Sequence, residues 1–286
     1  MSKIYFAPNW GMTSEDMLTF YNKQTKNKSG SWNKLSGTTD KESADYIVVQ
    51  DDTAESVDIN KVIFLGREPD HILPKRNSLK WENCHIFLHH AFNTAWLPQT
   101  WWVDIDYDAL TASPPEKDKM FSIIDSGRSA YNGHKARLTV IQQFLQKHSG
   151  NVDVWGRITE GREGTGPFKT SLPDRQKEAG LLPYKYSLAI ENGSTESYFS
   201  EKLIDPLLCW CMPIYFGCSN MSSFLPEGSF INIDIDSNTV ADDINDIIHS
   251  DYRECNLDKI AKAREMVYNK YNIWPTIELA IEKRAQ

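Results

Sequence analysis

Side chains suited to binding a phosphate gather in the stretch 184–217, where two apolar segments flank a polar loop. The first apolar segment ends in Glu191 and Asn192, and Glu201 and Lys202 open an apolar run with the character of a helix. In an open α/β sheet, ligands bind where strands end and helices begin, and the free backbone N–H groups of a helix start favour an anion. The stretch therefore predicts half of a nucleotide or phosphate site.

The segments around this stretch alternate between strand length and helix length. Short apolar runs predict strands over 120–124, 152–155, 187–190, 212–216 and 229–233, and spaced apolar residues predict helices over about 134–147, 240–249 and 257–268. Strands that alternate with helices indicate a parallel, doubly wound sheet. Residues 157–173 are rich in Gly, Thr and charge, so we expect an irregular surface loop there.

The first half of the chain predicts a second α/β domain with short helices. Strands are expected over 3–7, 44–49, 62–65 and 84–88, and a helix is expected to start at Ser14, a good N-cap. The strongest breaker is the Ser-Pro-Pro-Glu segment 113–116. We therefore expect an N-terminal domain over 1–112, a C-terminal domain over 113–270, and a final helix within 271–286 that could return to the first domain.

Composition narrows the class of protein. The 286 residues are 40% apolar and 24% charged, values typical of a soluble chain of two domains, and no apolar run reaches the roughly 20 residues of a membrane span. The net charge of -8 argues against nucleic acid and anionic membrane as partners. The five cysteines lack paired metal spacing, so we expect reduced, mostly buried thiols. The start of the sequence lacks the features of a signal peptide, and a cytoplasmic protein is expected.

Several common site motifs do not occur. No GxGxxG follows the first strand, and no Walker, HExxH or CxxC pattern appears, which argues against dehydrogenase, P-loop and zinc-site interpretations. The acidic triplets 104–106 and 234–236 have the DxD form found in metal-dependent transferases. Short acidic alternation is common at exposed strand ends, so we favour that interpretation for both and expect no metal site.

A resemblance to a known family rests on four segments, YKYSLAIENG (184–193), SYFSEKLIDPLL (197–208), MPIYFG (212–217) and SFINID (229–234). They resemble the donor-binding signature of glycosyltransferase family 10, the α-1,3/1,4-fucosyltransferases, in a soluble member of the bacterial type. The segment VDVWGR (152–157) is similar to the short strand that precedes this signature. The resemblance implies a GT-B fold, with two Rossmann-like doubly wound domains and a cleft between them.

The resemblance also implies a reaction. It implies an inverting enzyme that moves fucose from GDP-fucose to a hydroxyl of an acceptor glycan, as an α-1,3 linkage to a GlcNAc-type sugar, with no metal or cofactor required. Two alternatives stay open: a GT-B transferase that uses another nucleotide sugar, and a catalytically silent glycan-binding protein of the same fold. The acceptor, the linkage, the oligomeric state and closure of the 157–173 loop over the donor do not follow from the sequence.

Residue by residue, the resemblance places Asn192, Tyr198, Glu201 and Lys202 at donor-site positions of the family. Lys202 at a helix start could neutralise a diphosphate, and Glu201 could accept hydrogen bonds from ribose hydroxyls. A diphosphate-binding arginine of the family corresponds to Arg137, where a guanidinium would stabilise the leaving group.

Other residues are weaker candidates for the donor site. Arg128 and Lys135 lie near Arg137 in the sequence and could take its role, whereas Ser126, Lys185 and Glu191 are possible neighbours of the donor.

The base is expected from the first domain. The segment 64–71, FLGREPDH, resembles the part of the family that carries the base, which selects Glu68, with Asp70, His71 and Glu82 as further candidates. A carboxylate there could take the proton of the acceptor hydroxyl as its oxygen attacks the sugar from the face opposite GDP.

Acceptor-binding residues are the least defined part of the predicted site. Trp10, His71 and Trp96 are predicted to contact the acceptor sugar, because an aromatic ring can stack on a sugar, although most tryptophans serve core packing.

Overall fold

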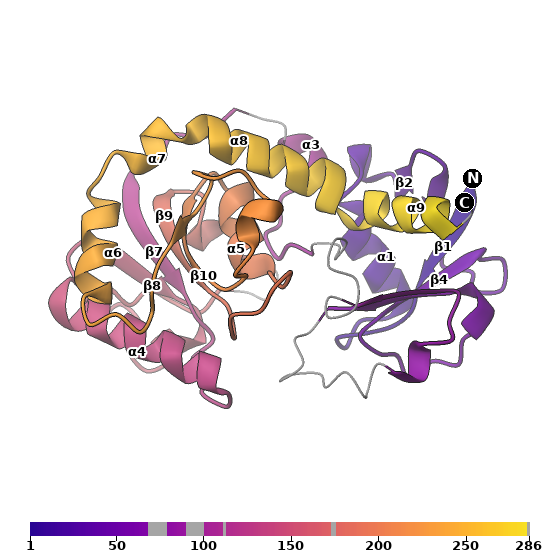
Figure 1. The fold of residues 1–286 in the computed structure, drawn as a ribbon, viewed down its shortest axis with the longest axis horizontal. Coiled ribbons are helices and arrows are strands. Elements are labelled where there is room, and N and C mark those ends of the chain that lie inside the picture. The colour runs from indigo at the N-terminus through magenta and orange to yellow at the C-terminus, as the bar shows by residue number, and fades with distance from the viewer. Residues whose placement is uncertain (68–78, 90–99, 111–112, 173–175, 285–286) are drawn as a thin grey trace. The chain divides into compact units, whose positions relative to one another are not determined.

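The computed structural model describes residues 1–67, 79–89, 100–110, 113–172 and 176–284. The chain forms two compact units, each built on its own sheet (Figure 1). Unit 1 comprises residues 1–100, 105–112 and 267–286, and unit 2 comprises residues 101–104 and 113–266.

These units differ from the predicted domains at two places. Residues 101–104 belong to unit 2, where the backbone N–H of Trp102 donates to the buried carboxylate of Asp205 at 2.9 Å. Residues 267–270 belong to unit 1, where Asn269 accepts a hydrogen bond from a tyrosine hydroxyl at 2.8 Å. Both differences arise from contacts between residues far apart in the sequence, which local patterns do not report.

Unit 1 is built on a six-stranded sheet of order β2-β3-β1-β4-β5-β6, in which β2 and β3 pair antiparallel and the other neighbours pair parallel. The strands are β1 (Ser2–Phe6), β2 (Ser31–Trp32), β3 (Leu35–Gly37), β4 (Tyr46–Gln50), β5 (Val62–Gly66) and β6 (Ile86–His89). All five residues of β5 are buried, as expected for a strand covered on both faces.

The α-helices that the structure describes in unit 1 are α1 (Ser14–Asn22), α3 (Tyr107–Leu110) and α9 (Ile273–Arg284). The N-cap of α1 is Thr13 and not Ser14: the Thr13 hydroxyl accepts from the backbone N–H of Asp16, and the Asp16 carboxylate accepts from the backbone N–H of Thr13. The prediction of Ser14 as the cap was therefore wrong by one residue, because this reciprocal capping box satisfies two backbone donors and Ser14 has no equivalent partner.

The last helix, α9, completes the core of unit 1. Trp274 at its start is 0% exposed, and its indole Nε1–H donates to the backbone oxygen of Tyr21 at 2.9 Å. Asn272, just before α9, donates to the backbone oxygen of Gln24 at 2.6 Å. The aromatic ring of Trp274 also packs edge-on against Phe6 of β1.

Unit 2 is built on a five-stranded, fully parallel sheet of order β11-β10-β9-β7-β8. The strands are β7 (Lys119–Ile124), β8 (Val152–Trp155), β9 (Tyr184–Ile190), β10 (Met212–Phe216) and β11 (Ile231–Asn232). The helices are α4 (Asn132–Lys147), α5 (Glu201–Leu208), α6 (Val240–Ile248), α7 (Tyr252–Cys255) and α8 (Leu257–Met266). This alternation confirms the α/β class predicted from the sequence.

The strand order of unit 2 reverses between β7 and β9. The chain passes from β7 through α4 to β8 on one side, and from β9 through α5 to β10 on the other. Right-handed crossovers then place α4 and α5 on opposite faces of the sheet, where α4 packs beside α6 and α5 beside α8 (Figure 1). Such a reversal leaves a crevice at the carboxyl ends of the two central strands, which is the usual ligand position in open α/β sheets.

The expected surface loop is partly ordered. In its described part, residues 157–172, a short helical turn spans Arg157–Thr159, and Phe168 forms a bridge with Val154 at the edge of the sheet. Among the helices that the structure describes, none is long and apolar enough to cross a membrane.

Candidate active site

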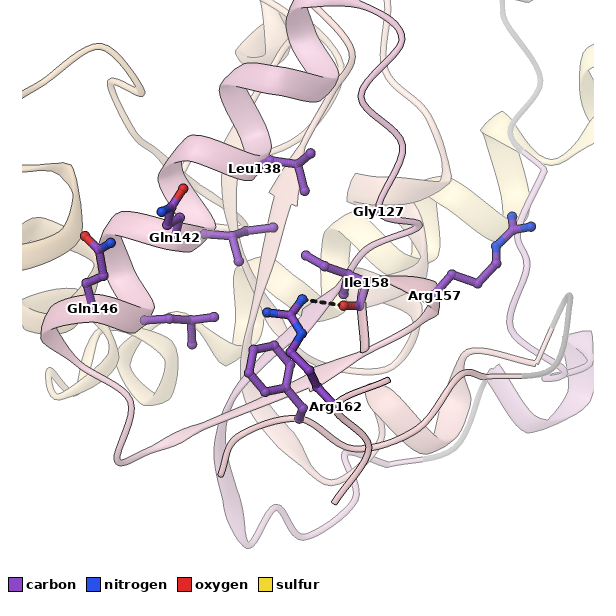
Figure 2. Close-up of a pocket in the computed structure, with 10 residues that line it drawn as sticks. Gly127, Leu138, Gln142, Gln146, Arg157, Ile158 and Arg162 are labelled. Atoms are coloured by element: carbon purple, nitrogen blue, oxygen red, sulfur yellow. Dashed lines mark hydrogen bonds between the residues drawn. The ribbon is translucent and has the colours of Figure 1, made fainter. Parts of the chain in front are cut away.

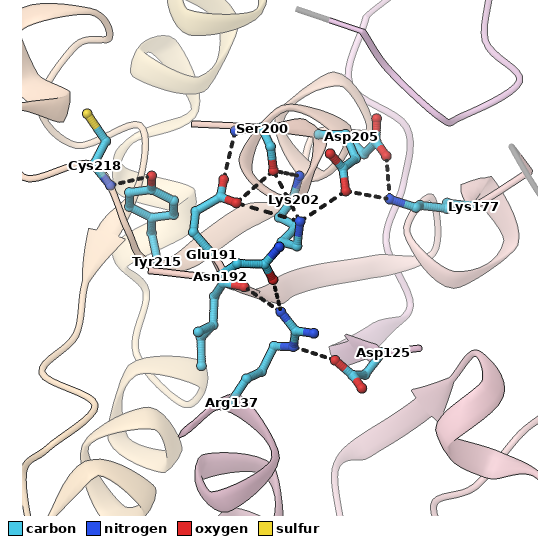
Figure 3. A network of polar contacts seen from close by, with 12 residues as sticks. Asp125, Arg137, Lys177, Glu191, Asn192, Ser200, Lys202, Asp205, Tyr215 and Cys218 are labelled. Carbon is cyan, nitrogen blue, oxygen red and sulfur yellow. Dashed lines mark hydrogen bonds and ion pairs between the residues drawn. The ribbon is translucent and has the colours of Figure 1, made fainter. Parts of the chain in front are cut away.

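Polar residues follow β7 and β9 at the point where the strand order reverses, as Figure 3 shows. Asp125 comes directly after β7, and Glu191 and Asn192 come directly after β9. The second turn of α4 contributes Arg137 to the same edge, and the first turn of α5 contributes Lys202. Strand ends and helix starts therefore meet at one place in unit 2.

Glu191 is fully buried and fixes the loop between β9 and α5. Its two carboxylate oxygens accept hydrogen bonds from the backbone N–H and the hydroxyl of Ser200, both at 2.7 Å. Ser200 is in turn the N-cap of α5. Burial raises the pKa of Glu191, and the nearby ammonium of Lys202, at 3.6 Å, opposes that effect. Glu191 therefore holds the start of α5 in place by hydrogen bonds that a neutral, apolar side chain could not make.

Glu201 and Lys202 form an ion pair at 3.2 Å in the first turn of α5. Burial alone would raise the pKa of Glu201, but Lys202 and Lys177 outweigh it and lower that pKa well below its usual range. Burial likewise opposes the charge of Lys202, yet Glu201 and Glu191 raise its pKa well above the ordinary value. Lys202 is thus a permanent cation at a helix start, with 24% of its side chain exposed.

Asp205 lies one turn further along α5 and is 1% exposed. It accepts from the backbone N–H of Trp102 at 2.9 Å and pairs with the ammonium of Lys177 at 2.9 Å. Lys177 also lies 3.9 Å from Glu201, so it joins the two carboxylates of α5. In this cluster each of the two lysines, Lys177 and Lys202, lies between carboxylates (Figure 3).

Arg137 is buried and links the ends of both central strands. Its Nε donates to Asp125, and its Nη1 donates to the backbone oxygen of Ile190 and to Oδ1 of Asn192, both at 3.2 Å. Among the described residues, none accepts a hydrogen bond from Nη2 of Arg137. A guanidinium has five N–H donors, so Arg137 keeps donors that a phosphate oxygen could use.

The start of α4 lies directly against the end of β9. A Cβ placed on Gly133 would lie 1.9 Å from the backbone oxygen of Asn192, so only glycine allows this approach. His134 follows in the same turn and is 6% exposed, and its Nδ1 has no hydrogen-bond partner in the part of the chain that the structure describes. Burial and then the charge of Arg137 lower the pKa of His134, which keeps the ring neutral near pH 7.

The structure brings together most of the predicted donor-site residues. Arg137, Asn192, Glu191, Glu201 and Lys202 lie in one network.

The other predicted donor-site residues, Tyr198, Ser126 and Lys185, lie at different places in unit 2. Tyr198 is 4% exposed in the loop that leads to α5, and Ser126 lies beside Asp125 in the loop after β7. Lys185 lies near the start of β9, where it pairs with Glu254 at 3.3 Å, so the structure does not bring it to the network. Lys185 lies five positions before Ile190, the last residue of β9. Because a strand rises about 3.3 Å per residue, Lys185 is far from the network at the end of β9.

The network also contains residues that the sequence did not select. Asp125 pairs with Arg137 and Lys177 lies 3.9 Å from Glu201, whereas Asp205 pairs with Lys177. The position of Asp125 immediately after a predicted strand was the available signal. Lys177 and Asp205 carried no such signal, because one lies in an irregular segment and the other in an apolar helix.

Of the predicted residues in unit 1, Trp10 and Glu82 are described. Trp10 follows β1 and is half-buried, with the guanidinium of Arg67 at 5.6 Å from its ring centre. Glu82 is exposed in a turn before β6. Glu68, Asp70, His71 and Trp96 lie outside the described residues, so the assignment of the base stays a prediction.

A hollow of about 560 Å³ in unit 2 lies between α4 and the 157–172 segment (Figure 2). Leu138, Ile141 and Phe168 contribute apolar groups to its lining, and Gln142 and Gln146 contribute polar ones. The guanidinium of Arg162 lies 4.1 Å from the ring centre of Phe168, and its Nη2 donates to the backbone oxygen of Ile158 at 2.7 Å.

Two features set the chemistry that the network can support. In the described ranges, no group of three or more His, Cys, Asp or Glu side chains is arranged to hold a metal ion. Two fixed cations lie near helix starts, Arg137 in the second turn of α4 and Lys202 in the first turn of α5. Helix starts and guanidinium or ammonium groups are the features that proteins use to bind a diphosphate.

The fold is that of the GT-B glycosyltransferases. A solved structure titled as an α1,3-fucosyltransferase with GDP-fucose aligns with a TM-score of 0.51 at 16% identity, over 98% of this chain and 90% of that one. At that identity the likeness establishes the fold.

A family model matches part of the chain. Residues 114–254 match the family model described as glycosyltransferase family 10 (fucosyltransferase), C-terminal. Residues 114–254 are therefore similar to the C-terminal domain of glycosyltransferase family 10, which confirms the resemblance carried by the 184–217 stretch.

Two curated relatives show how far the similarity extends. The GDP-fucose protein O-fucosyltransferase 3 of Xenopus tropicalis is 42% identical over 87 residues, which are 30% of this chain and 18% of that protein. The α-(1,4)-fucosyltransferase of Arabidopsis thaliana is 51% identical over 49 residues, which are 17% of this chain and 12% of that protein. The matched stretches thus span less than a fifth of the length of either relative.

Proposed function

We propose that this protein transfers fucose from GDP-fucose to a hydroxyl group of an acceptor glycan, with inversion at the anomeric carbon. The observation that carries the proposal is the pair Arg137 and Lys202, fixed at the switch point of a domain that matches the family 10 model. The names of the relatives, which include GDP-fucose and α-(1,4)-fucosyltransferases, support the choice of donor.

The proposed reaction needs charge stabilisation on the leaving GDP. As the bond to the sugar breaks, negative charge develops on the β-phosphate, and the guanidinium of Arg137 and the ammonium of Lys202 would stabilise it. Both are held in place before the donor binds, because buried carboxylates already orient them. In this proposal the two cations do the work of a divalent metal, so no metal or other cofactor is required.

The other half of the reaction is assigned to unit 1. Glu68 would take the proton from the acceptor hydroxyl as its oxygen attacks the anomeric carbon from the face opposite GDP. We propose an α-1,3 linkage to a GlcNAc-type sugar. The five free cysteines fit the reducing conditions of the cytoplasm, which we propose as the location.

Release of GDP from GDP-fucose, measured across a panel of glycan acceptors, tests this function. The panel includes N-acetyllactosamine-type and bacterial surface glycans and a serine- and threonine-rich peptide, because one relative is named as a protein O-fucosyltransferase. Thermal shifts with GDP, UDP and GDP-fucose identify the donor. A stabilisation by UDP alone would contradict the proposed donor, and tight GDP binding with no turnover on any acceptor would favour a silent glycan-binding protein.

Substitutions separate the two halves of the site. Lys202→Met should weaken GDP binding by about 10-fold or more, since it removes a charged hydrogen-bond donor to the phosphates. Lys147→Met is the matched control, because Lys147 is half-exposed in the same unit and pairs only with surface groups. Glu68→Gln should keep GDP binding and lose transfer, and full transfer by that variant would refute Glu68 as the base.

A further inference from the structure

An arginine at the edge of the unit 1 sheet is held by neutral partners. Arg67 directly follows β5, and its Nη1 donates to Oε1 of Gln50 at 2.9 Å and to Oγ1 of Thr100. In the ranges described, no carboxylate forms an ion pair with this guanidinium. Asp51 engages Arg67 through the backbone, where its carboxylate accepts the N–H of Arg67 at 2.6 Å.

Two described acids that follow β4 pair with lysines. Asp52 pairs with Lys80 at 2.6 Å, and Glu55 pairs with Lys41 at 3.2 Å. Among the described residues, the side-chain partners of the Arg67 guanidinium are therefore a glutamine and a threonine. A partly buried cation without a direct counter-ion is costly to the fold unless an anionic group comes to it.

One edge of the guanidinium has no hydrogen-bond partner among the residues that the structure describes. A guanidinium carries five N–H donors, and the two on Nη1 are used by Gln50 and Thr100. The donors that remain, on Nε and Nη2, lie side by side on one edge. That edge forms the two parallel hydrogen bonds by which arginine binds a carboxylate or a phosphate.

A buried network keeps this edge in a fixed direction. Gln50 is 1% exposed, and its Nε2 donates to the hydroxyl of Tyr21, which also lies 3.3 Å from Oγ1 of Thr100. Asn9 donates to the backbone oxygen of Gln50, so the loop after β1 joins the same network. Because the partners of Nη1 are themselves held by buried hydrogen bonds, the guanidinium is oriented before any ligand binds.

An aromatic ring accompanies the guanidinium. Trp10 is half-buried beneath Arg67, with φ of 52°, and Asp51 has φ of 58°. These residues follow β1 and β4, which are neighbouring strands, so two left-handed backbone conformations occur together at one edge of the sheet. Such conformations cost of order 1–3 kcal/mol each and concentrate at ligand-binding positions.

We propose that Arg67 and Trp10 form a subsite for an acidic sugar of the acceptor, one that carries a carboxylate, phosphate or sulfate group. Trp10 packs against the face of the sugar ring, and the Nε and Nη2 edge of Arg67 binds the oxyanion. The proposal rests on the proposed function, since it assigns the substrate class of the same reaction. In a chain of net charge -8, an acidic sugar is selected by this local cation and not by the overall charge.

Matched acceptor pairs test the subsite. Transfer from GDP-fucose is measured with oligosaccharides that differ only in a terminal glucose or glucuronate, and in a galactose with or without a 6-sulfate or 6-phosphate. The proteins are the wild type, Arg67→Gln, Arg67→Lys and the control Lys34→Gln. Lys34 is an 83% exposed cation at the opposite, amino-terminal edge of the same sheet, where its backbone oxygen accepts from Ser2.

We expect the wild type to prefer the acidic member of at least one pair by about 10-fold or more in kcat/KM. This is the preference expected from one or two hydrogen bonds to a charged group. Arg67→Gln should remove that preference and change kcat/KM for the neutral acceptor by less than about threefold. Arg67→Lys should keep part of the preference, because lysine retains the charge but cannot form two parallel hydrogen bonds. Which pair responds identifies the oxyanion. Equal losses on acidic and neutral acceptors would overturn the proposal, as would a wild type without preference for any acidic acceptor.

Donor measurements keep this test separate from that of the function. GDP affinity and hydrolysis of GDP-fucose in water depend on unit 2 and should be unchanged in Arg67→Gln. If the wild type neither binds GDP nor hydrolyses GDP-fucose, the proposed function is wrong. Saturation-transfer NMR with the acidic and neutral sugars alone then still tests the subsite. Absence of a contact that depends on Arg67 in that experiment would refute the subsite.

Discussion

Gly133 offers the sharpest test of how the donor site is assembled. A Cβ at this position would lie 1.9 Å from the backbone oxygen of Asn192 and 2.3 Å from its carbonyl carbon. Because real Cβ atoms essentially never come closer than 3.0 Å, Gly133→Ala must move α4 away from the end of β9 by about 1.1 Å. The obstacle is backbone, so a rotamer change cannot relieve it.

The expected magnitude follows from two opposing effects. Alanine inside a helix is favoured over glycine by about 1 kcal/mol. Overpacking against a fixed backbone costs about 1–3 kcal/mol, so the variant should lose up to about 2 kcal/mol of stability. The hydrogen bond between Arg137 and Asn192, now 3.2 Å, would lengthen beyond the hydrogen-bond range. Misplacing a charged group by about 1 Å can cost about 100-fold in activity.

GDP affinity by calorimetry and Tm by thermal unfolding measure the two effects. Gly150→Ala is the matched control, since a Cβ there has nothing within 4 Å. We expect weaker GDP binding by at least about 10-fold in Gly133→Ala and no loss in Gly150→Ala. Wild-type GDP affinity together with a wild-type Tm in Gly133→Ala would refute the claim that α4 and β9 are in direct contact at the site.

Two further predictions concern the rest of the molecule. Lys202 and Lys177 hold the pKa of Glu201 below its ordinary 4.5, so their ion pairs stabilise the fold above that pH and are lost as the pH falls through the lower folded-state pKa. The difference in Tm between wild type and Glu201→Gln should therefore shrink from about pH 6 to about pH 3, and a constant difference would contradict the ion-pair assignment. Trp274→Ala should lower the free energy of unfolding in urea by about 3–5 kcal/mol, because this indole is fully buried in unit 1. Trp32→Ala should lower it by less, because Trp32 is half-buried. Equal losses would show that α9 is not part of the core.

The sequence predicted the architecture because most strands are signalled locally. Parallel strands buried on both faces appear as short continuous apolar runs, and β5 and β10 were expected to within one residue. The strand expected over 229–233 shrinks to Ile231–Asn232, because β11 is an edge strand that pairs only with β10. Strand ends depend on such pairing, which an apolar pattern does not contain.

The site was only partly predictable for a related reason. Glu191, Glu201 and Lys202 are close in sequence and lie within a family signature. Asp125, Lys177 and Asp205 join them through contacts between distant segments, and a buried aspartate within an apolar helix gives no sign of its partner. Lys185 was selected by its nearness in sequence, although a side chain at the start of a strand lies far from the residues at its end.

The return of α9 to unit 1 reverses the order in which the chain can fold during synthesis. Unit 2 ends at Met266, so its segments have all been translated before Trp274 leaves the ribosome. Most of unit 1 precedes unit 2 in the sequence, yet its core lacks Trp274 and the Asn272 hydrogen bond to Gln24 until the segment after unit 2 is made. Of the two units, the one whose synthesis begins earlier is therefore completed later, and its sheet lacks that part of its core while unit 2 can already fold.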